Sequence, residues 1–231
     1  MDIIPKPVVN MNQGVYYMRM KTLPHLQFET PLWQEDFLVC GIDEVGRGCF
    51  AGPLVVGAVV LKPINHSDYS AILSLGIQDS KLLSPKKRKK IKEAAQPFIL
   101  FQTVEFIPVE AINKQGLGYA NKLGFQLAAK KILKMDKRVF FLTDAFKIPE
   151  IEISKQKNII RGDSTSVSIA LASILAKLER DSYMEKLSLE FPDYGFEKHK
   201  GYGTLFHRKA INTYGLSPHH RTEFCKKYPA I

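Results

Sequence analysis

Short apolar runs alternate with amphipathic segments along the chain from residue 37 onward. The apolar runs are rich in β-branched and aromatic side chains and are bounded by glycine, proline or polar residues, as is typical of buried strands. This pattern predicts β-strands at 37–42, 54–61, 98–107, 138–143 and 158–161. Most of the predicted sheet therefore precedes the longest helical segment.

Helical signals dominate the later part of the chain. Ser84 followed by Pro85 is typical of a helix start, because serine caps free N–H groups and proline suits the first turn. Gly116 and Gly118 are expected to split the next helix into two pieces. Helices are predicted at 85–97, 109–134, 164–189 and 205–214, and the Gly/Tyr/His-rich segment 194–204 is predicted as a loop.

Early strands followed by late helices predict an α/β fold, a sheet domain with a helical C-terminal region. Residues 1–37 contain four prolines and little periodicity, so they are interpreted as an N-terminal extension. The core domain is expected at 38–190, and a C-terminal helical region is expected at 191–231.

The charge balance favours a polyanionic partner. The chain has 33 Lys+Arg against 23 Asp+Glu, a net charge of +10, and phosphate neutralisation by such a protein releases counterions. The alternative is a soluble protein that is merely basic. The N-terminus lacks the pattern of a signal peptide, and the longest apolar run, 50–61, is too short to span a bilayer. We therefore expect a cytoplasmic protein without membrane contact.

Cysteine usage is consistent with a reducing compartment. Cys40, Cys49 and Cys225 are odd in number, and their spacing fits no zinc motif. Cys40 lies in a predicted strand, so we expect a buried free thiol there. The histidines at 207, 219 and 220 likewise have no zinc-ligand spacing.

Four acids stand where apolar elements meet loops. Asp43 and Glu44 follow the first predicted strand, Asp144 follows the strand at 138–143, and Asp163 precedes the long helix. Sites in α/β sheets form at such strand ends. Asp43 and Glu44, being adjacent, can serve one site only if the strand ends there.

Each acid also fits an ordinary structural role. Asp163 is suited to capping the long helix, Asp144 to starting a turn, and Asp43 and Glu44 to a solvated strand end. The repetition of the pattern favours a shared site instead. Mg²⁺ prefers oxygen ligands, and two ions about 3.5–4 Å apart can activate water and stabilise a leaving oxygen in phosphodiester hydrolysis.

Two further patterns have simpler explanations. The segment 46–51 fits the loose glycine pattern of a dinucleotide-binding loop, but Gly52, Pro53 and an apolar run follow it where a helix is required. The basic run Lys86–Lys90 is either a solvated helix face or a phosphate-binding patch.

The ordered motifs of the chain resemble the ribonuclease HII family, the type 2 ribonucleases H. The resemblance covers nearly everything between residues 38 and 225. Its motifs are GIDEVGRGCFAGPLVVGAVVL at 41–61, DSKLLSPKKR at 79–88, FLTDAF at 141–146, IIRGDSTSVSIALASILAKLERD at 159–181, FPDYGFEKHKGYGTLFH at 191–207 and GLSPHHRTEF at 215–224.

This resemblance implies an RNase H-like fold, a mixed five-stranded sheet flanked by helices with a C-terminal helical region. It implies a metal-dependent endoribonuclease that cuts the RNA strand of RNA–DNA hybrids and nicks 5′ to ribonucleotides embedded in duplex DNA. The family's catalytic and metal-binding acids fall on Asp43, Glu44, Asp144 and Asp163, with two Mg²⁺ or Mn²⁺ ions expected. Asp181 lies about 27 Å further along a continuous helix than Asp163, so we interpret it as structural.

The resemblance also implies substrate-binding residues. Gly46, Arg47 and Gly48 match a loop in which glycines let the backbone approach the sugar and arginine holds phosphate. Tyr202 matches a tyrosine that packs against the deoxyribose after the ribonucleotide, and Lys200 belongs to the same motif.

Two more assignments come with departures from the family pattern. Lys81 matches a phosphate-binding lysine, although Leu82 replaces the lysine that follows it. Arg221 matches one arginine of the tail motif, although Thr222 replaces the next. Cys49 stands where proline is common in the family.

The cellular role implied is removal of ribonucleotides from DNA, in repair and replication, by a monomer. The nearest rival is the sister ribonuclease HIII type, but the Gly-Arg-Gly loop and Tyr202 favour HII, and residues 1–37 are too short for the extra domain of that sister type. A rival from another class is a non-catalytic, basic nucleic-acid-binding protein. It explains the charge but not the acids at strand ends.

Overall fold

The computed structural model describes residues 23–226 of the chain. The part of the predicted N-terminal extension before residue 23 and the tail after residue 226 lie outside the described residues. No helix within 23–226 is long and apolar enough to cross a membrane.

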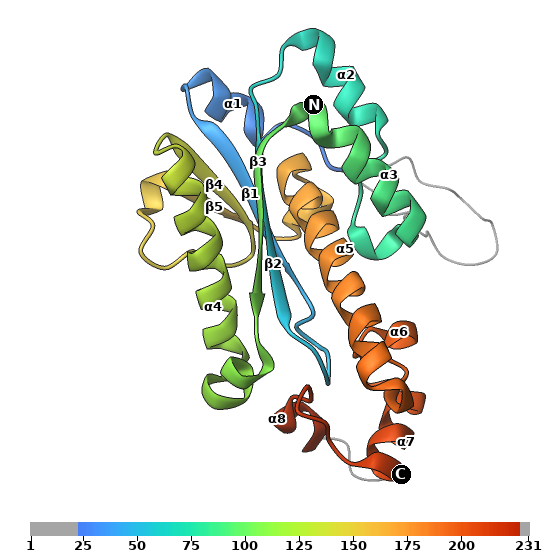
Figure 1. Cartoon of the computed structure of the whole chain (residues 1–231). Helices are drawn as coiled ribbons and strands as arrows, with labels where there is room; N and C mark the ends of the chain where they lie inside the picture. Colours follow the sequence, from blue (N-terminus) through green and yellow to red (C-terminus); the bar gives the residue numbers. More distant parts are fainter. Residues whose placement is uncertain (1–22, 227–231) are drawn as a thin grey trace, which may run out of the picture.

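A mixed five-stranded sheet forms the centre of the fold (Figure 1). The strand order is β3-β2-β1-β4-β5, in which β1 pairs antiparallel with β2 and parallel with β4. The outer pairs are β2–β3, antiparallel, and β4–β5, parallel. The strands are β1 Leu38–Val45, β2 Leu54–Leu61, β3 Ile99–Ile107, β4 Val139–Asp144 and β5 Gln156–Ile159. This sheet confirms the predicted fold class.

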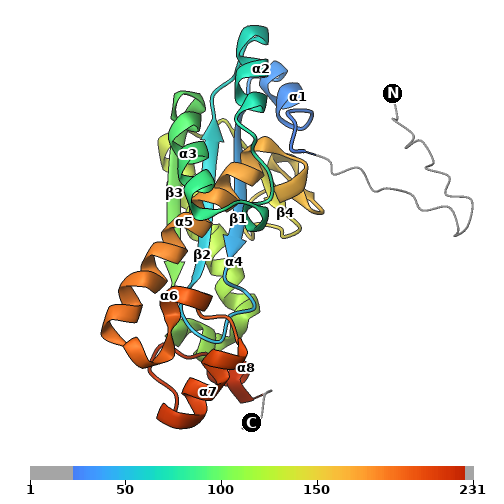
Figure 2. The same cartoon turned by 90° about the vertical axis from the view of Figure 1, so that its right-hand side faces the viewer.

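Helices cover both faces of the sheet, as Figures 1 and 2 show. One face is covered by α5, which packs against β1 and β2, with α3 against its outer side. The other face is covered by α4, which packs mainly against β3 and β2. The buried apolar side chains of the two faces form the separate clusters that hold these layers together. These helices are α2 His66–Ser74, α3 Pro85–Ala95, α4 Val109–Met135 and α5 Val167–Glu190.

The remaining helices lie at the two ends of the described chain. Near its start, α1 Glu29–Gln34 packs against β1 and the start of α5. Near its end, the short helices α6, α7 and α8 gather below the sheet, beside the lower half of α5 (Figure 2). They are α6 Phe196–His199, α7 Leu205–Tyr214 and α8 Thr222–Lys226, and 3₁₀ turns occur at Ser80–Leu82, Gln96–Phe98, Ile153–Lys155, Gly162–Ser164 and Pro192–Tyr194.

Several predicted boundaries are confirmed. The strand at Leu54–Leu61 has the predicted bounds, and α3 begins at Pro85 with the Ser84 side chain accepting a hydrogen bond from the Lys87 amide. Gly116 breaks α4 with a φ of 83°. Cys40 is a buried free thiol.

Other elements differ from the prediction, including β1, which ends at Val45 instead of 42, and α3, which ends at Ala95 instead of 97. Strand β5 spans Gln156–Ile159 instead of 158–161, because Arg161 adopts a left-handed φ of 58° that ends extended pairing. Helix α5 starts three residues later than predicted, since Gly162–Ser164 forms a separate turn. The predicted loop 194–204 contains the helix α6.

Candidate active site

Eight of the eleven predicted site residues meet in a pocket where β1 continues past the end of β4, and Asp163, Lys200 and Arg221 do not line it. The pocket has a volume of about 180 Å³. Two carboxylates of β1, one of β4, the glycine-rich loop and two lysines surround it. Its lining residues are Asp43, Glu44, Val45, Gly46, Arg47, Gly48, Ser80, Lys81, Asp144, Lys177 and Tyr202.

Strand β1 does not end at its acids, contrary to the condition expected from the sequence. It continues antiparallel to β2 as far as Val45, whereas its parallel pairing with β4 stops at Ile42. The side of β1 that β4 leaves free therefore opens beside the acids. Both Asp43 and Glu44 line the same pocket for this reason.

Helix α5 approaches β1 closely enough to determine the surroundings of Asp43. A Cβ on Gly41 would lie 2.1 Å from the backbone carbon of Ser168, so only glycine fits there. This approach brings Ser173 of α5 into hydrogen-bond contact with the Asp43 carboxylate, and Ser80 lies 3.0 Å from Ser173, hydroxyl oxygen to hydroxyl oxygen. The sequence reading missed both serines.

The carboxylates are close enough to affect one another's ionisation. Burial, followed by repulsion from Glu44, raises the pKa of Asp43 well above its usual range, and Asp144 and Asp163 add to the rise. Burial also raises the pKa of Glu44, against the opposing effect of Arg47. The pKa of Asp144 is raised by burial first and then by Asp163. Four acids thus share one electrostatic environment.

Asp144 and Asp163 each have a neighbouring partner in the protein. The Gly162 amide donates a 2.8 Å hydrogen bond to Asp144 Oδ1. Asp163 Oδ2 lies 3.8 Å from Lys81 Nζ. Asp163 does not cap α5, because that place belongs to Ser166, whose side chain accepts from the Ile169 amide. The capping alternative for Asp163 is therefore wrong.

The donor set suits a hard cation such as Mg²⁺, because carboxylate oxygens that repel one another gain most from a shared positive charge. Within residues 23–226, no three Asp, Glu, His or Cys side chains already converge closely enough to hold an ion. The carboxylates do not converge because each one contacts another group of the protein. Glu44 Oε1 lies 3.1 Å from Arg47 Nη1, Asp144 accepts from the Gly162 amide, and Asp163 lies near Lys81. Metal binding would require these carboxylates to exchange protein partners for the ion.

Two buried arginines hold the Gly46–Gly48 loop in place. Gly46 has a φ of 97°, and a Cβ there would meet Arg180 Nε at 2.3 Å. Arg180 donates to the carbonyl oxygens of Ala51, Pro53 and Lys200. It is a further functional residue that the sequence reading missed. Its burial is visible only in the structure, since an arginine near the end of the motif at 159–181 looks like a surface cation in the sequence.

Arg221 is also fully buried, whereas the phosphate contact predicted for it requires an accessible side chain. It donates to the carbonyl oxygens of Gly46, Arg47 and Gly52. Burial lowers the pKa of Arg221 to about 10. The guanidinium is thus used inside the protein, where it supports the Gly46–Gly48 loop.

Tyr202 and Lys200 differ in what they offer to the pocket. The Tyr202 side chain lines it, the residue is 39% exposed, and its backbone forms an antiparallel bridge with Cys49. Lys200 Nζ instead contacts Glu185 Oε1 at 2.8 Å and the carbonyl oxygen of Glu197 at 2.6 Å. Tyr202 therefore meets the site, whereas Lys200 is engaged elsewhere.

Lys81 and Lys177 supply positive charge at the pocket. Burial alone would lower the pKa of Lys81, but nearby Asp79 and Asp163 outweigh it and raise that pKa. Lys177, which the sequence reading missed, lies 2.6 Å from Asp181 Oδ1. Arg88 Nη2 lies 2.9 Å from Asp181 Oδ2, which supports the structural interpretation of Asp181.

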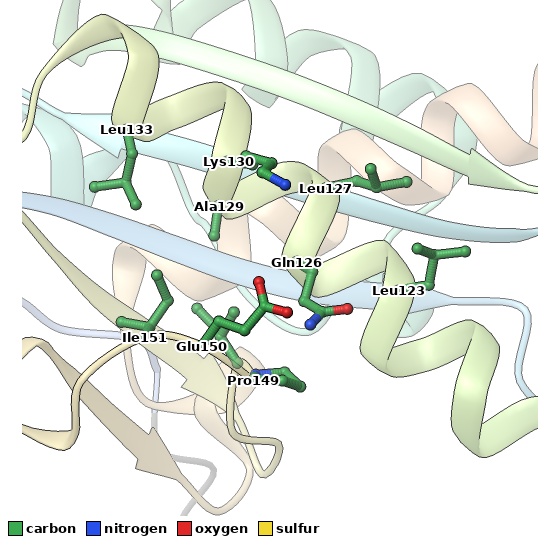
Figure 3. A pocket seen from close by; sticks show the side chains of 10 residues that line it. Leu123, Gln126, Leu127, Ala129, Lys130, Leu133, Pro149, Glu150 and Ile151 are labelled. Carbon is green, nitrogen blue, oxygen red and sulfur yellow. The ribbon is translucent and has the colours of Figure 1, made fainter.

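A second hollow, of about 270 Å³, lies between α4 and the segment 148–151 (Figure 3). It is lined mainly by apolar side chains, with Gln126, Lys130 and Glu150 as the polar members. It contains none of the four acids. The smaller pocket at β1 is therefore the candidate active site.

The family model for ribonuclease HII matches residues 40–227. The chain belongs to the ribonuclease HII family. It is 40% identical over 187 residues to ribonuclease HII of Dehalococcoides mccartyi, covering 81% of this chain and 85% of that one. It is 40% identical over 202 residues to ribonuclease HII of Clostridioides difficile, covering 86% and 74% of the two chains. The members of the ribonuclease HII family are metal-dependent endoribonucleases that hydrolyse RNA in RNA–DNA hybrids.

Solved structures show the same fold. The chain is similar to ribonuclease HII in a complex with PCNA from Archaeoglobus fulgidus, with a TM-score of 0.65 and 24% identity over 83% of this chain and 95% of that one. It is similar to ribonuclease H2 of Pyrococcus horikoshii, with a TM-score of 0.64 and 23% identity over 82% and 95% of the chains. These likenesses agree with the sheet order and the two helical layers described above.

Proposed function

We propose that this member of the ribonuclease HII family nicks duplex DNA on the 5′ side of embedded ribonucleotides and cuts the RNA strand of longer hybrids. The observation that carries the proposal is the pocket at β1, which brings three of the four acids together with the Gly46–Gly48 loop and Tyr202. Chemistry and substrate recognition would then share one small volume.

We infer that Asp43, Glu44, Asp144 and Asp163 hold two divalent ions, Mg²⁺ or Mn²⁺. When bound, the ions would activate the attacking water and stabilise the leaving oxygen. The protein side chains contribute the surroundings. Asp43 is held by Ser173, and Lys81 and Lys177 supply positive charge for the phosphates next to the cut.

Substrate choice would depend on the sugar at each side of the cut. RNA differs from DNA in the minor groove by its 2′-hydroxyl. Gly48 is the exposed glycine of the Gly46–Gly48 loop, and a Cβ on it would meet nothing within 4 Å, so a sugar can approach this loop closely. The partly exposed Tyr202 ring suits packing against the next, deoxyribose, sugar.

The cellular role that follows is removal of ribonucleotides from DNA in the cytoplasm, during replication and repair, by a monomer. The non-catalytic alternative fits less well. A protein that only binds nucleic acid gains nothing from carboxylates that repel both one another and phosphate.

Cleavage of three labelled duplexes tests the proposal: DNA with one ribonucleotide, continuous RNA–DNA hybrid, and plain DNA. We expect metal-dependent cutting of the first two and none of the third. Asp43→Asn should lower cleavage by about a thousandfold or more, because bound metal supplies several kcal/mol of transition-state stabilisation. Asp36→Asn is the matched control, since the Asp36 side chain is 91% exposed. Tight binding without any cleavage by the wild type would contradict the proposal.

A further inference from the structure

A cluster of three buried histidines lies beneath the segment that carries Tyr202. His199, His207 and His220 are 9%, 0% and 1% exposed. The rings of His199 and His207 stack with centroids 4.4 Å apart. Phe196 packs edge-on against His207, with centroids 5.5 Å apart. None of these histidines lines the pocket at β1.

Two of these histidines form a continuous hydrogen-bonded chain. The Ser217 amide donates to His220 Nδ1 over 2.9 Å. His220 Nε2 lies 3.0 Å from His207 Nε2, and His207 Nδ1 lies 2.9 Å from the carbonyl oxygen of Tyr202. We call this chain, from Ser217 through His220 and His207 to Tyr202, the histidine relay.

The backbone groups at its two ends fix every proton in the relay. The Tyr202 carbonyl only accepts, so His207 Nδ1 must carry a proton, and the other nitrogen of a neutral His207 is then an acceptor. His220 Nε2 must therefore donate to it. A neutral His220 then accepts at Nδ1, which is what the Ser217 amide requires. Both rings satisfy their partners in this single arrangement.

The relay ends on a residue whose backbone is held from all sides. The Tyr202 amide donates to the carbonyl oxygen of His199 over 2.9 Å. Its carbonyl accepts from the Thr204 amide over 2.8 Å as well as from His207, and its bridge partner is Cys49. Only the ring is left partly exposed, toward the pocket.

We propose that His207 and His220 are positioning residues that fix the backbone of Tyr202 and so determine how well the enzyme selects an RNA-to-DNA junction over a continuous hybrid. This inference rests on the proposed function, in which the Tyr202 ring packs against the sugar after the ribonucleotide. The relay acts through the carbonyl of Tyr202 and does not touch the substrate.

Packing alone does not require a histidine at position 207. A phenylalanine at 207 would preserve the stacked, apolar surroundings provided by His199 and Phe196. It would leave the His220 N–H without its acceptor and would remove one of the two donors to the Tyr202 carbonyl. An asparagine at 207 would keep a donor at the place of Nδ1 while breaking the link to His220. These two variants therefore separate ring packing from hydrogen bonding.

The test is kcat and KM for DNA with one ribonucleotide and for continuous hybrid, measured on His207→Phe, His207→Asn, Tyr202→Ala and the double variant His207→Phe/Tyr202→Ala. We expect His207→Phe to lower kcat/KM about tenfold for DNA with one ribonucleotide, because the loss of one hydrogen bond has an effect of about this size. Hybrid cleavage should change by less than about threefold, and His207→Asn should restore most of the junction activity. In the Tyr202→Ala background, His207→Phe should have no further effect on selectivity.

The outcomes separate this inference from the proposed function. If Tyr202→Ala leaves junction selectivity unchanged, the junction reading by Tyr202 is wrong. If Tyr202→Ala lowers selectivity but His207→Phe lowers both activities equally, or adds fully to Tyr202→Ala, the relay inference alone is wrong. His220→Gln, which keeps a donor toward His207, provides a second route if His207→Phe fails to fold. It should retain junction selectivity, whereas His220→Leu should lose it, and equal selectivity in these two variants would also overturn the relay.

Discussion

Arg221 Nη1 donates a 2.7 Å hydrogen bond to the carbonyl oxygen of Gly46, which lies 175 residues earlier in the chain. The same guanidinium binds the carbonyl oxygens of Arg47 and Gly52. The C-terminal region thus supports the Gly46–Gly48 loop from inside the protein. This loop beside Asp43 and Glu44 is positioned by tertiary contacts, and its own sequence supplies only the glycines that permit its shape.

Replacing Arg221 by lysine should destabilise the protein strongly. Lysine cannot reproduce the planar fork that binds three carbonyl oxygens, and each hydrogen bond to a charged group contributes about 1.5–3 kcal/mol. We expect the free energy of unfolding to fall by about 3 kcal/mol, measured by urea denaturation. Arg138→Lys is the control, because the Arg138 side chain is 63% exposed. Equal losses in the two variants would show that Arg221 has no special role.

The buried Glu29 should stabilise the start of α5. Its Oε1 atom accepts hydrogen bonds from the Ser166 hydroxyl, the Ser168 amide and the Ser168 hydroxyl. Glu29→Ala removes all three, so we expect a loss of about 2 kcal/mol in the free energy of unfolding. Glu35→Ala, at an exposed position of the same segment, should change it by less than about 0.5 kcal/mol. A stable Glu29→Ala variant would mean that residues before 38 contribute little to the core.

Lys81 should bind a phosphate, because it is an exposed cation beside the acids, with a side chain that is 70% exposed. Lys81→Gln should weaken binding and reduce the dependence of log K on log salt by about 1. The measurement is a salt series of binding curves in the Asp43→Asn background. Lys130→Gln, in the hollow of Figure 3, is the matched control. An effect of Lys130→Gln as large as that of Lys81→Gln would contradict binding of the duplex at the pocket beside β1.

Acid should destabilise the histidine relay. Burial first, and then the neighbouring imidazoles, lower the pKa of both His207 and His220 from an ordinary value of 6.5 to about 4. The imidazoles are those of His199 and His220 for His207, and those of His219 and His199 for His220. Between pH 6.5 and pH 4 the unfolded chain therefore binds more protons than the folded one, so these two groups reduce stability as pH falls. Below about pH 4 their effect levels off.

The carboxylates of Asp43 and Asp144 act in the opposite direction, because their raised pKa values make the folded state bind more protons than the unfolded one. The useful measurement is therefore the difference in the free energy of unfolding between wild type and His220→Gln, at intervals from pH 7 to pH 4. We expect the variant to lose less stability than wild type over this range. Parallel curves would show that His220 does not titrate as described.

The hydrophobic pattern was sufficient to predict most of the sheet, because buried strands such as Leu54–Leu61 have unmistakable apolar runs. The four acids could be located for a related reason: each follows or precedes such a run. Strand β5 was misplaced because a left-handed backbone at Arg161, which no side-chain pattern reveals, ends the pairing. Ordered motifs were needed to connect the acids with one another.

Contacts between distant segments could not be predicted from the sequence. Arg221 and Arg180 look like surface cations in the sequence, and their burial depends on carbonyl oxygens that the folded loop exposes. The histidine relay could not be predicted either. His207 and His220 do not have the spacing of metal ligands, and they meet only when α7 packs beside the segment 215–221. Such groups are recognisable once the fold supplies their partners.

The most direct test of the account is the position of the cut in a DNA duplex with a single ribonucleotide, mapped with labels at each end. The account predicts a nick on the 5′ side of the ribonucleotide with Mg²⁺ or Mn²⁺, none with EDTA, and loss of the nick in Asp43→Asn with retained binding. A cut at another position, a cut that persists in EDTA, or full activity of Asp43→Asn would contradict it.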